Sequence, residues 1–246
     1  MKIVIYTFAE NFTLQLAIEL IPKGVEPVEV TTREEVLEFL KNQNDEAIIL
    51  LSESSELEFL KQAKEIKSNT YIFLIYHGSF KSAELMELMK IGITSLIEYS
   101  DNPAKIVDDI IQNIIRNNIR INERRKHLRI TPSPYEEVTA SIYIKNINRF
   151  VHGSLIDISA GGVAVKLKDS IEASILIINQ IYDPLLLHIR GMEIKTISRL
   201  IGKRGAMAGF KFENVEEKDM RKIATYIHMR IGENTKKLIN ELLKTK

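Results

Sequence analysis

The stretch LIDISAGG, Leu155–Gly162, decides the fold of the second half of the chain. Side chains alternate between the two faces of a β-strand, so Ile156 and Ile158 are expected on one face, in a core. Asp157 and Ser159 then share the opposite, outer face. The stretch therefore predicts a strand that presents a carboxylate and a hydroxyl side by side.

This stretch lies in a series of short β-rich runs. The runs are VTASIYI (138–144), FVHGSLIDIS (150–159), VAVKLK (163–168), SILIIN (174–179), LLLHIR (185–190), EIKTISRLI (193–201) and MAGFKF (207–212). Turn residues separate them, and Gly161-Gly162 is one such turn because glycine accepts unusual backbone angles. Many short strands punctuated in this way predict an antiparallel Greek-key β-barrel. Two helices, over 216–232 and 234–244, are expected to follow it.

The first half of the chain alternates strand and helix patterns. Strands are predicted at 2–6, 27–30, 47–51, 71–76 and 94–99, and helices at 11–21, 33–40, 55–67, 81–91 and 103–121. Five strands alternating with helices predict an α/β fold with a doubly wound parallel sheet. The helix from about 103 carries a regular isoleucine stripe, which is expected to pack on this first domain. A second copy of the same stripe, in a homodimer, is the alternative partner.

The charge distribution supports two units. Residues 1–115 carry 10 Lys and Arg against 19 Asp and Glu, whereas residues 116–246 carry 24 against 14. We predict an α/β domain at 1–118, a basic linker at 119–131 and a barrel with C-terminal helices at 132–246. The basic half favours an anionic partner, although two oppositely charged domains could also attract each other.

Composition narrows the class of protein further. The 246 residues include no Cys, which excludes disulfides, cysteine zinc sites and thiol catalysis. The five His residues show no metal-ligand spacing, and no catalytic or nucleotide-phosphate motif is present. We therefore predict a protein that is not an enzyme and has neither metal nor cofactor. The N-terminus does not resemble a signal peptide and no apolar run reaches about 20 residues, so we expect a cytoplasmic protein without membrane insertion.

The first domain resembles the receiver domain of two-component response regulators in the order and spacing of its elements. The resemblance implies an acidic pair after the first strand, an Asp after the third and a Lys after the fifth. Those places hold Thr7-Phe8-Ala9-Glu10, Leu51-Ser52 and Glu98-Tyr99. Phosphoryl transfer needs an Asp nucleophile and carboxylates that hold a divalent cation. We therefore predict a degenerate receiver that is not phosphorylated and acts as a docking or dimerisation scaffold.

The linker contains the basic stretch ERRKHLRI, residues 123–130. Its Arg125-x-x-x-Arg129 pattern, followed by Asp157-x-Ser159-x-x-Gly162, resembles the PilZ domain over about residues 122–232. This family implies binding of the bacterial second messenger cyclic di-GMP.

The chemistry of these side chains suits that ligand. An arginine guanidinium is a planar fork that pairs with phosphate oxygens or with guanine O6 and N7. A carboxylate such as Asp157 can accept from guanine N1 and N2, and Ser159 can bond a phosphate or a base edge. The candidate ligand-binding residues are Arg125, Arg129, Asp157, Ser159 and Gly162, with Arg124, Lys126 and Gly161 as further candidates. The alternative for Arg124 and Lys126 is that they are solvated charges of the linker. The sequence is compatible with either one or two ligand molecules in the site.

We therefore predict a cyclic di-GMP effector in signal transduction. Its ligand would order the linker against the barrel, change the domain arrangement and control a process such as motility or virulence through a downstream protein. The alternatives are a ligand-independent adaptor and, less favoured, an RNA-binding protein. The last rests on Gly202-Lys-Arg-Gly205, which resembles the backbone-gripping loop of KH domains but is flanked by strand patterns.

Overall fold

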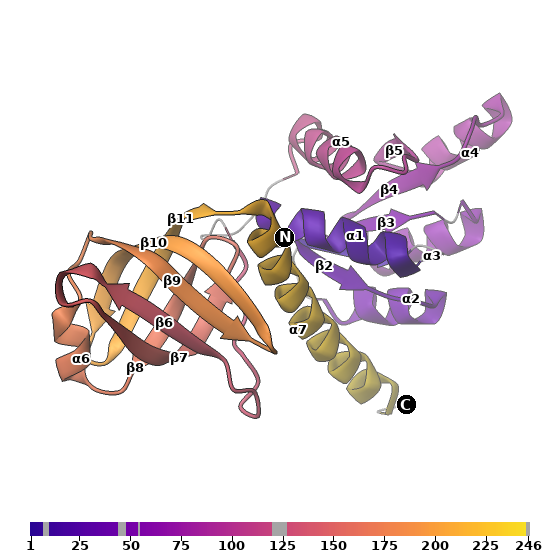
Figure 1. The fold of residues 1–246 in the computed structure, drawn as a ribbon. Coiled ribbons are helices and arrows are strands. Elements are labelled where there is room, and N and C mark those ends of the chain that lie inside the picture. The colour runs from indigo at the N-terminus through magenta and orange to yellow at the C-terminus, as the bar shows by residue number, and fades with distance from the viewer. Residues whose placement is uncertain (7–9, 44–47, 54, 120–126, 245–246) are drawn as a thin grey trace. The chain divides into compact units, whose positions relative to one another are not determined.

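The computed structural model describes residues 1–6, 10–43, 48–53, 55–119 and 127–244 (Figure 1). The chain divides into two compact units, Met1–Arg125 with Ile231–Lys246, and Lys126–Arg230. The boundary between the units falls inside the predicted linker, 119–131, and the far half of the last helix groups with the first unit. The predicted barrel domain, 132–246, had included that half.

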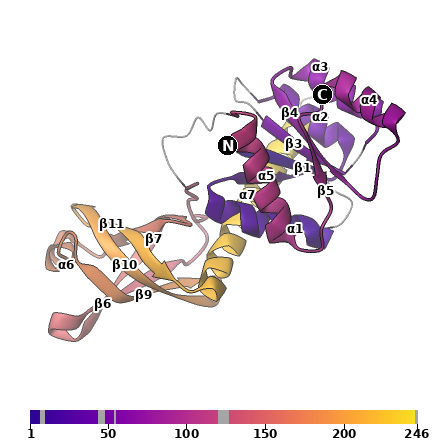
Figure 2. The ribbon, with the colours of Figure 1, turned by 90° about the horizontal axis from the view of Figure 1, so that it is seen from above.

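The first unit is a five-stranded parallel sheet covered by helices on both faces (Figure 2). Its elements are β1 (Lys2–Tyr6), α1 (Glu10–Leu20), β2 (Glu26–Glu29), α2 (Arg33–Lys41), β3 (Ile48–Ser52), α3 (Leu57–Ile66), β4 (Thr70–Tyr76), α4 (Ser82–Ile91), β5 (Ser95–Glu98) and α5 (Pro103–Arg116). The strand order is β2-β1-β3-β4-β5. Helices α1 and α5 share one core with the sheet, and α2, α3 and α4 share the other. The predicted receiver-like, doubly wound fold is thus confirmed.

Helix α5 packs on this sheet, as the isoleucine stripe predicts. Ile106 and Ile110 are fully buried in the core that α5 shares with α1. The Asn102 side chain accepts a hydrogen bond from the Ala104 amide at 3.1 Å and caps the helix start. The helix ends at Arg116, earlier than the predicted 121, and Asn118 then adopts a positive φ of 50°.

The second unit contains a closed antiparallel barrel of six strands. They are β6 (Thr139–Ile144), β7 (Arg149–Ser159), β8 (Gly162–Leu167), β9 (Ile181–Ile189), β10 (Met192–Arg204) and β11 (Met207–Val215). Strands β6, β7 and β8 form a meander, and the chain then crosses over so that β9 pairs with β6. This return is the Greek-key arrangement that was predicted.

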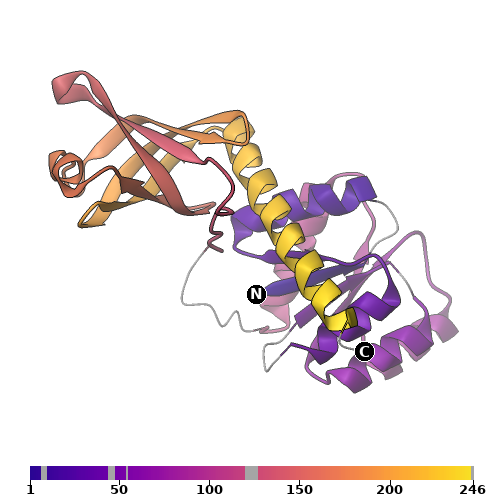
Figure 3. The ribbon, with the colours of Figure 1, turned by 90° about the horizontal axis from the view of Figure 1, so that it is seen from below.

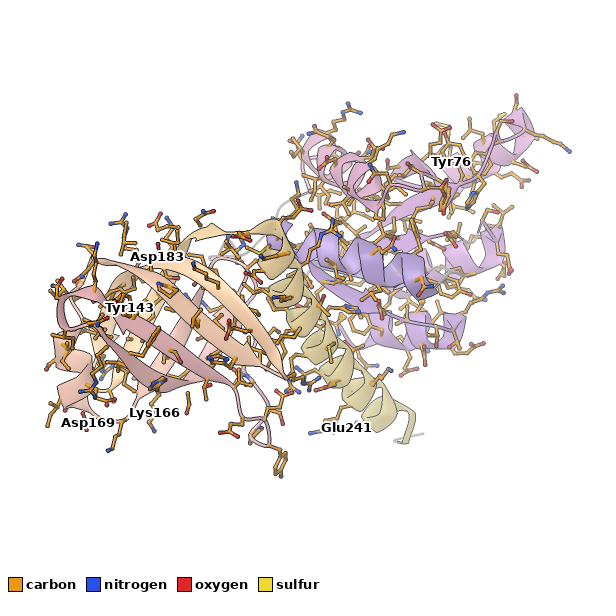
Figure 4. The ribbon with its side chains drawn as sticks, in the orientation of Figure 1. Tyr76, Tyr143, Lys166, Asp169, Asp183 and Glu241 are labelled. Atoms are coloured by element: carbon orange, nitrogen blue, oxygen red, sulfur yellow. The ribbon has the colours of Figure 1, made fainter. Side chains whose placement is uncertain are left out.

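Two predicted elements of this unit are wrong. The run SILIIN is not a strand, because Asp169 caps a short helix, α6 (Ser170–Ile175), by accepting from the Glu172 amide at 2.8 Å (Figure 4). The isoleucines therefore occupy the end of that helix and the loop after it. The two predicted C-terminal helices are one, α7 (Glu217–Lys244), which continues through Gly232 (Figure 3).

The turn in the run LIGKRG joins β10 to β11 and is a β-hairpin, not a loop between helices. Its Lys203 ammonium donates to the carbonyl oxygens of Ala173, Ser174 and Leu176, at 3.1, 3.3 and 2.7 Å. A cation at a helix C-terminus satisfies carbonyls that have no partner within the helix. Lys203 thus fastens α6 to the barrel.

Candidate functional site

Asp157 is directed outward by a β-bulge. The register between β7 and β8 shifts between Leu155 and Asp157, which makes Ile156 the extra residue. Leu155 and Ile158 are both buried in the barrel, although simple alternation from Leu155 would place Asp157 inward. A bulge resets alternation and re-aims the next side chain. The Asp157 carboxylate is consequently half-exposed, as predicted, whereas Ile156 is only half-buried and lies outside the predicted core.

Ser159 organises the turn that follows. Its hydroxyl accepts from the Gly161 amide and donates to the Gly162 carbonyl, both at 3.3 Å. The residue is only 6% exposed, so it does not stand on the outer surface as alternation predicts. The geometry gives Ser159 a structural role in the β7–β8 turn, and its contact with a ligand stays a prediction.

The two glycines of the turn are required by different neighbours. A Cβ on Gly162 would overlap the Phe210 carbonyl oxygen of β11. A Cβ on Gly161 would instead overlap the His127 ring of the linker, with Nε2 only 3.0 Å away. Gly162 therefore permits strand pairing within the barrel, and Gly161 permits close approach of the linker.

The end of the linker is anchored to the barrel beside Asp157. Ile130 and Ile158 exchange two backbone hydrogen bonds of 2.8 and 2.9 Å in an isolated antiparallel bridge. This bridge places Arg129 next to Asp157, and Nη1 of the arginine lies 3.8 Å from Oδ2 of the aspartate. Both side chains are partly exposed, at 46% and 26%, so they are accessible to a ligand. A single long contact leaves most of the arginine fork available for other acceptors.

The remaining candidates of the linker, Arg124, Arg125 and Lys126, lie outside the described residues. The structure thus brings together Arg129, Asp157, Ser159, Gly161 and Gly162 around one turn. The part played by the other three basic residues stays a prediction.

A largely covered carboxylate, that of Glu136, stabilises the segment that follows the linker, and sequence reasoning missed it. In the sequence alone, Glu136 next to Glu137 is typical of a solvated turn charge. Its carboxylate accepts from the Ser133 amide at 3.0 Å and from the Tyr226 hydroxyl of α7 at 2.9 Å, and it pairs with Arg190. The Arg230 Nε lies 4.0 Å away. The signal available in the sequence was the aromatic and basic spacing of α7, which places Tyr226 and Arg230 on one helix face.

The electrostatics of this cluster follow from its contacts. Burial of Glu136 opposes ionisation, but the hydrogen bonds from Ser133, Tyr226 and Arg190 outweigh it, so the pKa of Glu136 lies below its usual range. Burial, together with the neighbouring carboxylate, raises the pKa of Tyr226 far above its usual value. The phenol therefore remains a hydrogen-bond donor throughout the physiological pH range.

The receiver-like sheet has a different surface at the edge where receivers carry their acidic site. Ser52 ends β3 and is completely buried. The Tyr99 ring, just after β5, packs at a tilt against the rings of His77 and Phe12, with centroid distances of 4.1 and 5.2 Å. Thr7-Phe8-Ala9, where the acidic pair is expected, lies outside the described residues. Within the described part of the chain, no group of three or more His, Asp or Glu is placed to hold a metal ion.

The fold and site together define a two-part architecture, a receiver-like α/β sheet and a Greek-key barrel with an arginine-bearing linker. Residues 123–228 match the PilZ domain family model, and this part of the chain is a PilZ domain. No curated protein matches the chain. No helix within the described ranges has the length and apolarity required to span a membrane.

Solved structures similar to this chain match one half of it at a time. The PilZ domain of YcgR from Escherichia coli, solved with c-di-GMP, is 18% identical with a TM-score of 0.41, over 47% of this chain and 98% of that one. The MrkH–c-di-GMP complex of K. pneumonia is 18% identical with a TM-score of 0.41, over 47% and 56%. An atypical orphan response regulator is 15% identical with a TM-score of 0.39, over 47% and 96%. The chain covers 50% of the length of the longer YcgR structure.

Proposed function

We propose that this protein is a receptor for cyclic di-GMP and not an enzyme. The observation that carries the proposal is the juxtaposition of Arg129 with Asp157 within a PilZ domain. Arg129 offers a planar donor fork to a phosphate or to guanine O6 and N7. Asp157 offers an acceptor pair to guanine N1 and N2. These complementary groups favour a ligand that contains both phosphate and guanine.

The proposed site is divided between two chain segments. Arg129, with Arg125 and the further candidates Arg124 and Lys126, belongs to the linker, whereas Asp157 belongs to the barrel. The His127–Ile130 end of the linker already contacts the barrel, so a ligand held by both segments orders the part of the linker that carries Arg125 against the barrel and thereby changes the arrangement of the two domains. A ligand shifts such an equilibrium only by its differential affinity for the two arrangements. The changed arrangement would expose or cover the surface that a downstream protein recognises.

Isothermal titration with cyclic di-GMP tests the site directly. Wild-type protein is expected to release heat and to give the stoichiometry, one or two ligands, from the same curve. Arg125→Ala and Asp157→Ala are expected to abolish that heat. Lys168→Ala and Glu137→Ala serve as charge-matched controls, because each removes an exposed charge outside the motif. Absence of heat from the wild type would instead favour a ligand-independent adaptor.

Small-angle X-ray scattering tests the proposed change in domain arrangement. The radius of gyration is expected to fall when saturating cyclic di-GMP is added. Identical profiles with and without ligand, from protein that binds in the titration, would refute the rearrangement but not the binding.

RNA binding is less supported as a function of the basic half. The β10–β11 hairpin lacks the helical context of a KH loop, and the Lys203 ammonium is engaged by three carbonyls of α6 and the residue that follows it. Filter binding that depends on Lys203 and Arg204 but not on Arg125 would reverse this preference.

A further inference from the structure

His127 lies inside the arginine motif, but the motif assigns it no part. The ring is half-buried and rests on the β7–β8 turn, where it occupies the volume that a side chain at position 161 would need. Cγ and Nε2 of the ring would both lie within 3.2 Å of a Cβ on Gly161. Such distances would be shorter than real Cβ contacts allow, so a Cβ at position 161 would require the ring to shift, whereas glycine leaves the ring in place.

The backbone conformation at position 161 does not explain why the residue there is glycine. Five glycines of the described residues adopt positive φ angles, and Gly161 is not among them. The D-x-S-x-x-G pattern also leaves position 161 unspecified. The strands do not require it either, because the glycine needed for close pairing with β11 is Gly162. The steric demand at position 161 comes from the ring of His127.

Three contacts in succession hold this part of the linker. His127 packs on Gly161, Arg129 faces Asp157, and Ile130 pairs with Ile158 through two hydrogen bonds. The middle contact is a partly exposed, single-point ion pair and contributes little by itself. The position of Arg129 therefore depends on the contacts before and after it.

We propose that His127 is a positioning residue that fixes the linker on the Gly161 turn and so holds Arg129 at the ligand site before ligand arrives. This inference rests on the proposed function for its ligand, but the His127–Gly161 contact exists without ligand. Pre-organisation of the linker lowers the entropy lost on binding and raises affinity without any contact between His127 and the ligand.

A double-mutant cycle tests the proposal. Gly161→Ala in the full-length protein is expected to weaken cyclic di-GMP binding by about tenfold, because the methyl group expels the ring. His127→Ala is expected to weaken it by about threefold to tenfold, since one anchor is lost. In the His127→Ala background, Gly161→Ala is then expected to change affinity by less than about twofold. An equal loss in both backgrounds would overturn the proposal.

Gly202→Ala is the matched control for glycine replacement in a strand. No atom lies within 4 Å of a Cβ at that position, and its φ is not positive. Its affinity should equal that of the wild type. The thermal midpoint of the His127→Ala protein should also stay within about 2 °C of the wild type while affinity falls, since a general structural role would lower both.

Hydrogen exchange in the ligand-free protein separates failure of this inference from failure of the proposed function. The Ile130 and Ile158 amides, which form the bridge, should exchange about tenfold faster in His127→Ala and in Gly161→Ala than in the wild type. If these amides exchange faster in the variants but the wild type binds no cyclic di-GMP, the His127 anchor is supported and the proposed ligand is rejected. Unchanged exchange in both variants would reject the anchor, whatever the ligand does.

Discussion

The two units carry very different groups at the places where each fold usually binds its ligand. Doubly wound sheets bind at the carboxyl edge of their strands. In this protein that edge presents buried Ser52 and the packed rings of Tyr99, His77 and Phe12. The barrel, at the end of β7, presents a half-exposed carboxylate, an arginine and a glycine turn.

The difference shows that a receiver-like fold does not require the acidic residues of a receiver. Apolar burial on two faces is enough to maintain the receiver-like sheet, and none of that burial depends on an acidic site. The barrel unit relies more on directional contacts, including the Glu136–Tyr226 hydrogen bond and the Ile130–Ile158 bridge that holds the end of the linker. We therefore expect the barrel unit to respond to ligand and to loss of charge, and the sheet unit to respond to neither.

The largest expected effect is on stability and follows substitution of Glu136. Glu136→Ala removes the acceptor of Tyr226 and leaves Arg190 without this carboxylate, and the loss of a hydrogen bond to a charged group costs about 1.5–3 kcal/mol. Glu137→Ala, the exposed neighbour, should stay within about 0.5 kcal/mol. Urea unfolding monitored by tyrosine fluorescence measures both. Equal stability of the two variants would mean that the linker end of the barrel is not held by its charges.

The next effect concerns ligand affinity. Asp157→Asn keeps the shape of the side chain but removes the charge and replaces one acceptor, so cyclic di-GMP affinity should fall by about tenfold to one hundredfold. Glu98→Gln makes the equivalent change at the edge of the parallel sheet and should leave affinity within about twofold. Titration calorimetry compares them. If Glu98→Gln lowered the affinity for cyclic di-GMP as much as Asp157→Asn, the ligand site would have to be assigned to the sheet unit instead of the barrel.

The sequence predicted those features that depend on a repeating pattern. The five parallel strands and the Greek-key barrel follow from alternating apolar runs, and the outward Asp157 was placed correctly. That placement succeeded only because the alternation was counted from Ile158 toward Asp157. Counting from Leu155 gives the opposite answer, and the bulge at Ile156 reconciles the two. A β-bulge inserts an extra residue into the strand, and strict alternation of side chains between two faces does not predict it.

The features that the sequence did not predict depend on contacts between distant residues or on local caps and turns. Glu136 meets Tyr226, which is 90 positions away, and becomes a largely covered acceptor instead of a solvated charge. The run SILIIN looked like a strand because its composition is strand-like, although Asp169 and Glu172 provide a helix start just before it. The covered state of Ser159 arises from its own turn. In each case, tertiary contact or capping overrode local composition.

A smaller effect is expected from acidification. Burial raises the pKa of both Glu136 and Asp219, but other contacts outweigh it. Hydrogen bonds lower the pKa of Glu136, and Lys222 and the Lys195 amide lower that of Asp219. A carboxyl group with a depressed folded pKa stabilises the protein above its unfolded pKa and loses that contribution as pH falls through the folded value.

Among the described residues, the carboxyl groups with a lowered pKa are Glu136, Glu213 and Asp219 in the barrel unit and Glu35 in the sheet unit. Because the barrel unit has more of them, it should lose protection before the sheet core as the pH falls from about 5 to about 3, on either side of the ordinary carboxyl pKa. Hydrogen exchange read at Ala140 and Leu187 for the barrel, and at Ile49 and Phe73 for the sheet, distinguishes the units, because all four residues are buried strand positions. Simultaneous loss of protection in both units would show that these carboxylates do not set the acid limit of the barrel.

The smallest effect is expected at the sheet edge, where acetyl phosphate should transfer no measurable phosphoryl group. Transfer to a receiver requires an aspartate nucleophile at the end of the third strand and carboxylates that bind a divalent cation. Ser52 occupies the strand end and is buried, and the chain after β4 and β5 places the aromatic pair of His77 and Tyr99. Ser52→Asp alone should also remain unlabelled, since the Thr7-Phe8-Ala9-Glu10 segment supplies one carboxylate and not the pair that holds the cation. Phosphoryl labelling of the wild type, detected by Phos-tag electrophoresis, would contradict this prediction. It would show that the sheet edge accepts a phosphoryl group, and the contrast between the two units would then fail.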